Sequence, residues 1–183
     1  VMITQIATRV GAWSAQCRKA QLLKSKSAID AAVGAALDTD DPAELKFCAL
    51  RYSEIAQAAF DAGFFAVWTT ARQGEAATNY ELGSTHGDAA ALRRSISGLE
   101  ALLAGNAAKL SREETANLLR LLGHAHAELG HLTQDAGALN RAISAYEAST
   151  RHAQGRDQGR ITRLTEQNIR LCREAISSLR PTA

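Results

Sequence analysis

The sequence predicts an all-α protein, and the first observation behind this prediction is its composition. Of 183 residues, 37 are Ala and 21 are Leu, whereas Val and Ile together number 13 and Pro occurs twice. Ala and Leu lose little side-chain freedom in a helix, while sheets favour β-branched and aromatic residues. We therefore expect neither an all-β fold nor a doubly wound α/β fold.

The second observation is an internal similarity at a period of 47 residues. Of the 22 positions from Leu82 to Leu103, 11 are identical to the residue one period later, among them the pair Asp88 and Asp135. A weaker first copy lies around Asp41. A repeat of this length is typical of a helical solenoid, in which each helix pair buries its apolar face against its neighbours. We expect one helical-repeat domain over 1–183: irregular helices and a weak repeat in 1–63, repeats in 64–110 and 111–157, and a capping helix in 158–183.

The N-terminal portion, Met2 to Leu37, is expected to form one helix or to break into two. An apolar stripe with helical spacing runs along its start, over Met2, Ile6, Val10, Trp13 and Cys17. A membrane-surface helix has a similar pattern, but packing on the first repeat or on a second copy of the chain is the more ordinary explanation of the stripe. We expect no membrane contact.

Each repeat is predicted to be a helix, a turn and a second helix. The second helices are expected to begin after the N-cap residues Asp41, Asp88 and Asp135 and to end near Gly63, Gly105 and Gly155. The first helix of the last repeat opens with Ser111-Arg112-Glu113-Glu114, a capping box, so these two carboxylates are assigned to capping and not to catalysis. We expect this helix to end near Gly130, and Gly83 and Gly87 to lie in a turn.

The last helix is predicted from about Arg160 to Arg180, ended by Pro181. Its apolar residues are Leu164, Ile169, Leu171, Cys172, Ile176 and Leu179. Residues 151–183 contain seven Arg and three acidic residues, a net charge of +4, whereas the first 150 residues carry −2. Because this helix has acidic residues and no aromatic side chain for base stacking, we expect a solvated cap and no nucleic-acid partner.

The repeated residues resemble a known family, the tetratricopeptide repeats in their long bacterial form. The resemblance rests on Leu121-Leu122-Gly123-His124-Ala125, on Leu129-Gly130, and on the stretch from Asp135 to Glu147. Small and large residues also pair four apart on the second helices, at Cys48/Tyr52, Ser95/Leu99 and Ala142/Tyr146. The resemblance implies a right-handed α-α superhelix of helix hairpins with a C-terminal capping helix.

The resemblance also implies a concave groove, lined by the first helices, that binds a peptide or helix of another protein. Carried over to this chain, the groove positions are Thr70, Gln73, Ala77, Tyr80, Glu81, Asn117, Arg120, His124 and Glu128. Asn and Gln side chains can hydrogen-bond a peptide backbone, and Arg120 can bind a carboxylate. We therefore expect a non-enzymatic interaction or scaffold module, bacterial and cytoplasmic, with no cofactor.

Two alternatives remain open at this stage. One is a self-association domain, a homo-oligomer whose groove is filled by its own N-terminal helix. The other is a metal- or small-molecule-responsive regulator, because His124, Glu128 and His131 are spaced i, i+4 and i+7 on a helix. The three cysteines are odd in number and far apart, which favours a reducing compartment and buried structural thiols at Cys48 and Cys172.

Overall fold

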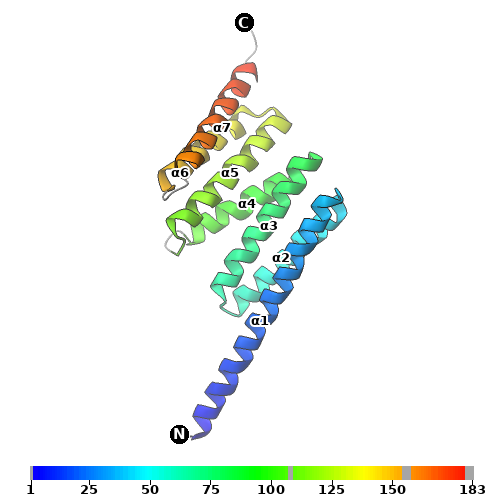
Figure 1. Cartoon of the computed structure of the whole chain (residues 1–183), viewed down its shortest axis with the longest axis vertical. Helices are drawn as coiled ribbons and strands as arrows, with labels where there is room; N and C mark the ends of the chain where they lie inside the picture. The colour runs from blue at the N-terminus through cyan, green and yellow to red at the C-terminus, as the bar shows by residue number, and fades with distance from the viewer. Residues whose placement is uncertain (1, 107–108, 154–157, 180–183) are drawn as a thin grey trace. The chain divides into compact units, whose positions relative to one another are not determined.

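The computed structural model describes residues 2–106, 109–153 and 158–179, and over these ranges the chain is all-α, with seven helices and no strand (Figure 1). The helices are α1 (Met2–Asp38), α2 (Pro42–Asp61), α3 (Phe65–His86), α4 (Ala89–Asn106), α5 (Arg112–Thr133), α6 (Ala136–His152) and α7 (Gln158–Leu179). The predicted fold class is thus confirmed at the level of an all-α protein.

Most predicted helix starts are confirmed by their capping contacts. The Asp41 carboxylate accepts hydrogen bonds from the backbone of Ala43 and Glu44, and Asp135 accepts one from Gly137. The Asp88 carboxylate likewise accepts from the backbone N–H of Ala91, at 2.9 Å. At the start of α5, Ser111 and Glu114 form the predicted capping box. Hydrogen bonds from the Ser111 side chain and backbone lower the pKa of the Glu114 carboxyl group.

The N-terminal portion forms one helix, α1, and of the two possibilities expected for it the break into two helices does not occur. Two predicted boundaries are wrong. The first helices do not stop at Gly83 and Gly130: α3 continues to His86 and α5 to Thr133. Only Gly87 lies in a turn, with a φ of 66°. The predicted positions at Gly155, Arg180 and Pro181, and the side chains of Met2, Ile6, Val10 and Trp13, lie outside the described part.

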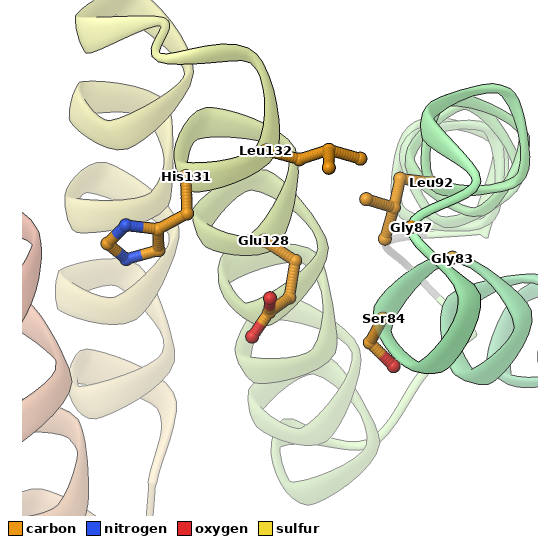
Figure 2. Close-up of a pocket in the computed structure, with 7 residues that line it drawn as sticks. All are labelled: Gly83, Ser84, Gly87, Leu92, Glu128, His131 and Leu132. Carbon is orange, nitrogen blue, oxygen red and sulfur yellow. The ribbon is translucent and has the colours of Figure 1, made fainter.

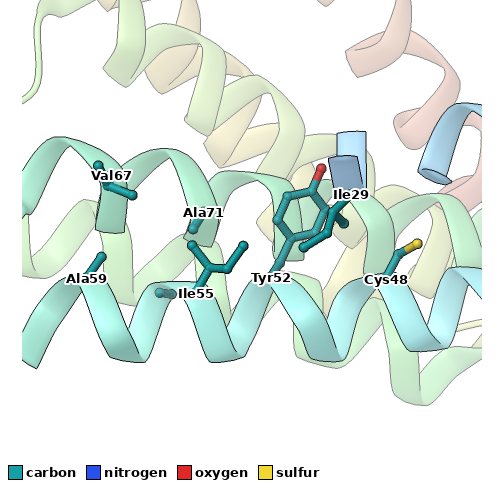
Figure 3. Packing of buried hydrophobic residues seen from close by; sticks show 8 residues of the cluster. Ile29, Cys48, Tyr52, Ile55, Ala59, Val67 and Ala71 are labelled. Atoms are coloured by element: carbon teal, nitrogen blue, oxygen red, sulfur yellow. The ribbon is translucent and has the colours of Figure 1, made fainter. Parts of the chain in front are cut away.

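The chain divides into two compact units, residues 1–75 and 76–183. In the first unit, α1 packs on α2, and the core includes Ile29, Cys48, Tyr52, Ile55, Ala59, Val67 and Ala71 (Figure 3). Cys48 is buried as predicted, whereas Cys17 is exposed.

In the second unit, α4 packs on α5, α5 on α6 and α6 on α7, and α5 also contacts α7. The interhelical core between α5, α6 and α7 contains Ala127, Leu139, Ala142, Tyr146, Ile169 and Cys172. Cys172 is therefore buried, as its position in the apolar pattern predicts.

Contacts in this unit recur at the period of the sequence repeat. Leu92 and Leu139, 47 residues apart, are both fully buried, and each fills the space beside a helical glycine, Gly83 and Gly130 respectively. A methyl group on Gly83 would lie 2.4 Å from the Cγ of Leu92, and one on Gly130 would lie 2.7 Å from the Cγ of Leu139. These glycines are needed for close approach of two helices, which explains why they do not end a helix.

A polar contact recurs in the same way. His126 Nε2 lies 3.9 Å from a Glu100 carboxylate oxygen, and one period later Arg173 Nη2 lies 3.7 Å from Glu147. Burial and the nearby Arg141 lower the pKa of His126 to about 4, so its imidazole is neutral at pH 7. The His126–Glu100 contact is therefore not an ion pair at neutral pH, unlike the contact of Arg173.

Candidate functional site

Five side chains of the second unit form what we call the α5 polar cluster: Tyr80, Arg120, His124, Glu128 and Tyr146. The two ring nitrogens of His124 have different neighbours. Its Nδ1 lies 2.9 Å from the hydroxyl of Tyr146 on α6, and its Nε2 lies 3.5 Å from Nη1 of Arg120, one turn earlier on α5. The rings of Tyr80 and Tyr146 lie near the imidazole, with centroids 6.3 Å and 5.3 Å from that of His124.

These contacts determine the state of His124. Burial, with a smaller effect of Arg120, lowers the pKa of the imidazole, so the ring is neutral at pH 7. A guanidinium can only donate, so Nε2 is the acceptor and Nδ1–H donates to the oxygen of Tyr146. Tyr146 is fully buried, so its hydroxyl supports His124 from the core, and the same burial raises the pKa of the phenol.

Two acidic groups influence Tyr80, namely Glu128 within the cluster and Glu81 beside it. Burial, with the negative charges of Glu128 and Glu81, raises the pKa of Tyr80, and burial alone raises the pKa of Glu81. Glu128 also lines a depression of about 280 Å³ between α3, α4 and α5 (Figure 2). Figure 2 shows Leu92 and Leu132 facing each other across its upper part and Ser84 opposite Glu128. The depression thus combines an apolar rim with a carboxylate, which suits the side chain of a bound polypeptide.

The cluster has a counterpart in the first unit, two repeat periods earlier. Lys26 Nζ lies 2.9 Å from both carboxylate oxygens of Asp30 and 5.9 Å from the centroid of the Tyr52 ring. The Tyr52 hydroxyl donates to Asp30. Burial raises the pKa of Asp30, but the hydrogen bonds from Tyr52 and Lys26 outweigh it and the net pKa is lowered.

The two constellations match position by position. Lys26, Asp30 and Tyr52 correspond to Arg120, His124 and Tyr146, each 94 residues later in the sequence. Both therefore consist of a cation, a hydrogen-bonding group one turn on, and a tyrosine from the following helix. In the middle repeat the corresponding residues are Gln73, Ala77 and Leu99, which cannot form these contacts.

The predicted groove residues are thus brought together only in part. Four of them lie together in the α5 polar cluster: Tyr80, Arg120, His124 and Glu128. Burial and the negative charge of Glu81 raise the pKa of Tyr80. Asn117 is exposed near the start of α5. Thr70, exposed, and Gln73, half-buried, lie on the part of α3 that belongs to the first unit. The contact between Tyr146 and His124 was not predicted from the sequence. The 22-residue spacing that also separates Asp30 from Tyr52 is the signal that could have identified it.

The histidine and carboxylate pattern considered for a metal does not form a ligand set. His124 is engaged by Arg120 and Tyr146, and Figure 2 shows His131 directed away from the Glu128 carboxylate. Among the described residues, no three His, Cys, Asp or Glu side chains are grouped as metal ligands would be. Across the same ranges, none of the helices has the length and apolar character needed to cross a bilayer.

Comparisons of the chain with protein-family models, with curated proteins and with solved structures find no match.

Proposed function

We propose that this chain is a non-enzymatic tetratricopeptide-like module whose repeats form a right-handed α-α superhelix and bind a segment of another protein along the first helices. The 47-residue period, together with the recurring Gly83–Leu92 and Gly130–Leu139 contacts, supports the assignment to helix hairpins that pack in one repeated way. The dispersed, odd cysteines support a cytoplasmic setting.

The α5 polar cluster is the observation that carries the binding proposal. Arg120, half-buried on α5, presents a guanidinium whose position is set by its contact with His124, and the fully buried Tyr146 holds His124 from the other ring nitrogen. Donors that are held in place lose little conformational entropy when a ligand binds, so they contribute more affinity than mobile surface groups. A peptide carboxylate or backbone carbonyl fits this guanidinium, and a side chain of the bound segment fits the depression beside Glu128.

The test is a selection of peptides from a random displayed library on the full chain, followed by fluorescence anisotropy of the selected peptides. Arg120→Glu reverses a charge within the α5 polar cluster. Arg93→Glu makes the same charge change at an exposed position on α4 and is the matched control. We expect Arg120→Glu to weaken binding about tenfold or more, which is about 1.4 kcal/mol, and Arg93→Glu to leave it unchanged.

Circular dichroism of both variants separates loss of binding from loss of folding. Selected peptides that bind wild type and Arg120→Glu equally well would show that the proposed surface is not the binding site. A library that yields no binder under these conditions would count against a peptide-binding function.

A further inference from the structure

The depression between α3, α4 and α5 has the size of one amino acid side chain. Its volume is about 280 Å³, whereas pockets for free small ligands measure about 300–1,000 Å³. One side of it is apolar. Leu132 of α5 is 46% exposed there, and Figure 2 shows it facing Leu92 of α4. A methyl group on Gly87 would lie 3.8 Å from Cδ1 of Leu132, so the glycine leaves the space beside this leucine open.

The depression also contains a carboxylate that has no counter-ion. Glu128 is half-buried, and within the described ranges no ion pair or hydrogen bond joins its side chain to another residue. By contrast, the carboxylates of Asp30, Glu75 and Asp135 each form an ion pair with a cationic side chain. A half-buried carboxylate loses part of its hydration, and a cation that pairs with it compensates for this loss. Glu128 is therefore suited to receive a cation from a ligand.

The cations on neighbouring helices are engaged elsewhere. Arg120 lies about two turns before Glu128 on α5, and its guanidinium lies 3.5 Å from Nε2 of His124. On α4, Arg94 donates to the side chain of Asn79 at 3.1 Å, and neither arginine of that helix lines the depression. The negative charge of Glu128 is thus not cancelled by a cation in the depression.

A second carboxylate adds to the negative charge. Glu81 lies on α3 one repeat period before Glu128 and is also half-buried. Burial, followed by the charges of Glu128 and Glu81, raises the pKa of Tyr80, and the opposing effect of Arg120 is the smallest of all. His131 also lines the depression, but Figure 2 shows its ring directed away from the Glu128 carboxylate. The two carboxylates therefore outweigh the guanidinium on this surface.

A basic side chain fits both the apolar side and the carboxylate. An apolar side chain would cover Leu132, but it would also remove water from Glu128 without replacing the lost hydrogen bonds. An acidic side chain would be repelled by both glutamates. A lysine or arginine has an aliphatic stem that packs on apolar surface and a charged head group that donates to a carboxylate.

We infer that the depression is the specificity pocket of the binding surface and that it accepts a lysine or arginine side chain of the bound segment. The stem of that side chain would lie along Leu132, and its head group would pair with Glu128. This inference rests on the proposed function, to which it adds the class of partner, a segment that carries a basic residue.

The experiment starts from the peptides that the full chain selects from the random displayed library. Each basic residue of a selected peptide is replaced in turn by an uncharged residue of similar length, lysine by norleucine and arginine by citrulline. Fluorescence anisotropy then measures the charged and the neutral peptides with wild type, with Glu128→Gln and with the matched control Glu113→Gln. Glu113 is an exposed glutamate on the same helix, so the control makes the same chemical change outside the depression.

We expect the selected peptides to share a lysine or arginine at one position. Its neutral replacement should weaken binding to wild type and to the control about tenfold or more, because an interfacial charge pair is lost. Glu128→Gln should bind the charged peptide about tenfold more weakly than wild type does, and it should bind the charged and neutral peptides alike. Its midpoint of unfolding in urea should match that of wild type, because the substitution breaks no ion pair among the described residues.

Selected peptides without a shared basic residue overturn the inference, as does a preference for the charged peptide that Glu128→Gln leaves unchanged. A lower urea midpoint of Glu128→Gln would show that the carboxylate already has a partner in the fold, which also overturns the inference. Sedimentation tests another occupant: a wild-type dimer that Glu128→Gln dissociates would mean that a second copy fills the depression, and the inference would be wrong.

The two variants separate this inference from the proposed function. If the selected peptides lose affinity with Arg120→Glu but not with Glu128→Gln, the proposed function stands and this inference fails. If neither variant weakens their binding, both fail.

Discussion

Substitution of Gly130 by Ala tests the close helix approach on which the packing of α5 and α6 depends. The new methyl group would lie 2.7 Å from the Cγ and 3.0 Å from the backbone nitrogen of Leu139, well inside the 3.5–4.0 Å of ordinary carbon contacts. The leucine side chain is fully buried, and its backbone nitrogen can move only with the whole of α6. The substitution therefore requires the two helices to separate.

The net change in the free energy of unfolding has two opposing parts. Forcing an extra methyl group into a packed core costs about 1–3 kcal/mol. Replacing a helical glycine by alanine stabilises the helix by about 1 kcal/mol. We therefore expect Gly130→Ala to lower the free energy of unfolding by about 1 kcal/mol.

Gly98→Ala is the matched control, because Gly98 lies in the same unit, within α4. A methyl group there would lie 3.7 Å from the Cβ of Ala76, an ordinary contact, and the position one period later already carries Ala145. We expect this control to stabilise the protein by about 1 kcal/mol.

Both variants are compared with wild type by urea unfolding followed by far-ultraviolet circular dichroism, from the midpoint and slope of the transition. The two substitutions should have effects of opposite sign. A Gly130→Ala protein at least as stable as wild type would refute the close approach of α5 and α6, and with it the reason given for glycine at this repeated position.

Three further predictions concern buried polar and thiol groups. Tyr146→Phe removes the hydrogen-bond partner of Nδ1 of the half-buried His124 and should lower the free energy of unfolding by about 1 kcal/mol in the same urea assay. His126→Gln should flatten the pH dependence of stability, because the unfolded imidazole takes up a proton near pH 6.5 whereas the folded one does so near pH 4. In wild type the folded state is therefore at its full stability above about pH 6.5 and loses up to about 3 kcal/mol as the pH falls to 4. Ellman's reagent should modify one thiol, the exposed Cys17, in the folded chain, and the two buried thiols only after unfolding.

Each of these predictions has a contradicting result. A Tyr146→Phe variant with wild-type stability would mean that His124 finds another partner or water. A wild-type protein whose stability does not fall between pH 6.5 and 4 more than that of the His126 variant would contradict the neutral buried imidazole. Fast modification of more than one thiol under native conditions would contradict the burial of Cys48 and Cys172.

The helix starts were predictable because capping is local. Each capping side chain accepts a hydrogen bond from a backbone N–H group no more than three residues away, as at Asp41, Asp135 and the pair Ser111 and Glu114. Both partners of the contact are therefore visible in a short stretch of sequence. The ends of the first helices were not predictable in this way. The sequence does not distinguish a glycine that ends a helix from one, such as Gly130, that lies within a helix and allows a second helix to approach closely.

The candidate site was predictable in its positions and not in its contacts. The repeat register identified Arg120 and His124 as neighbours on one helix face. The pairing of His124 with Tyr146 spans 22 residues and two helices, and the exposure of Leu164 and Leu171 depends on which face of α7 meets α6. Neither follows from the residues of a single helix.

The sequence by itself determined that this protein is built of helices, where most of them begin, and that its parts recur every 47 residues. Helix propensity and capping depend on residues close together in the sequence, and the repeat is found by comparing the sequence with itself. The tertiary structure decided which glycines bring helices together, that His124 is neutral between Arg120 and Tyr146, and which leucines remain exposed. Those properties depend on burial and on contacts between helices, which exist only once the helices have packed.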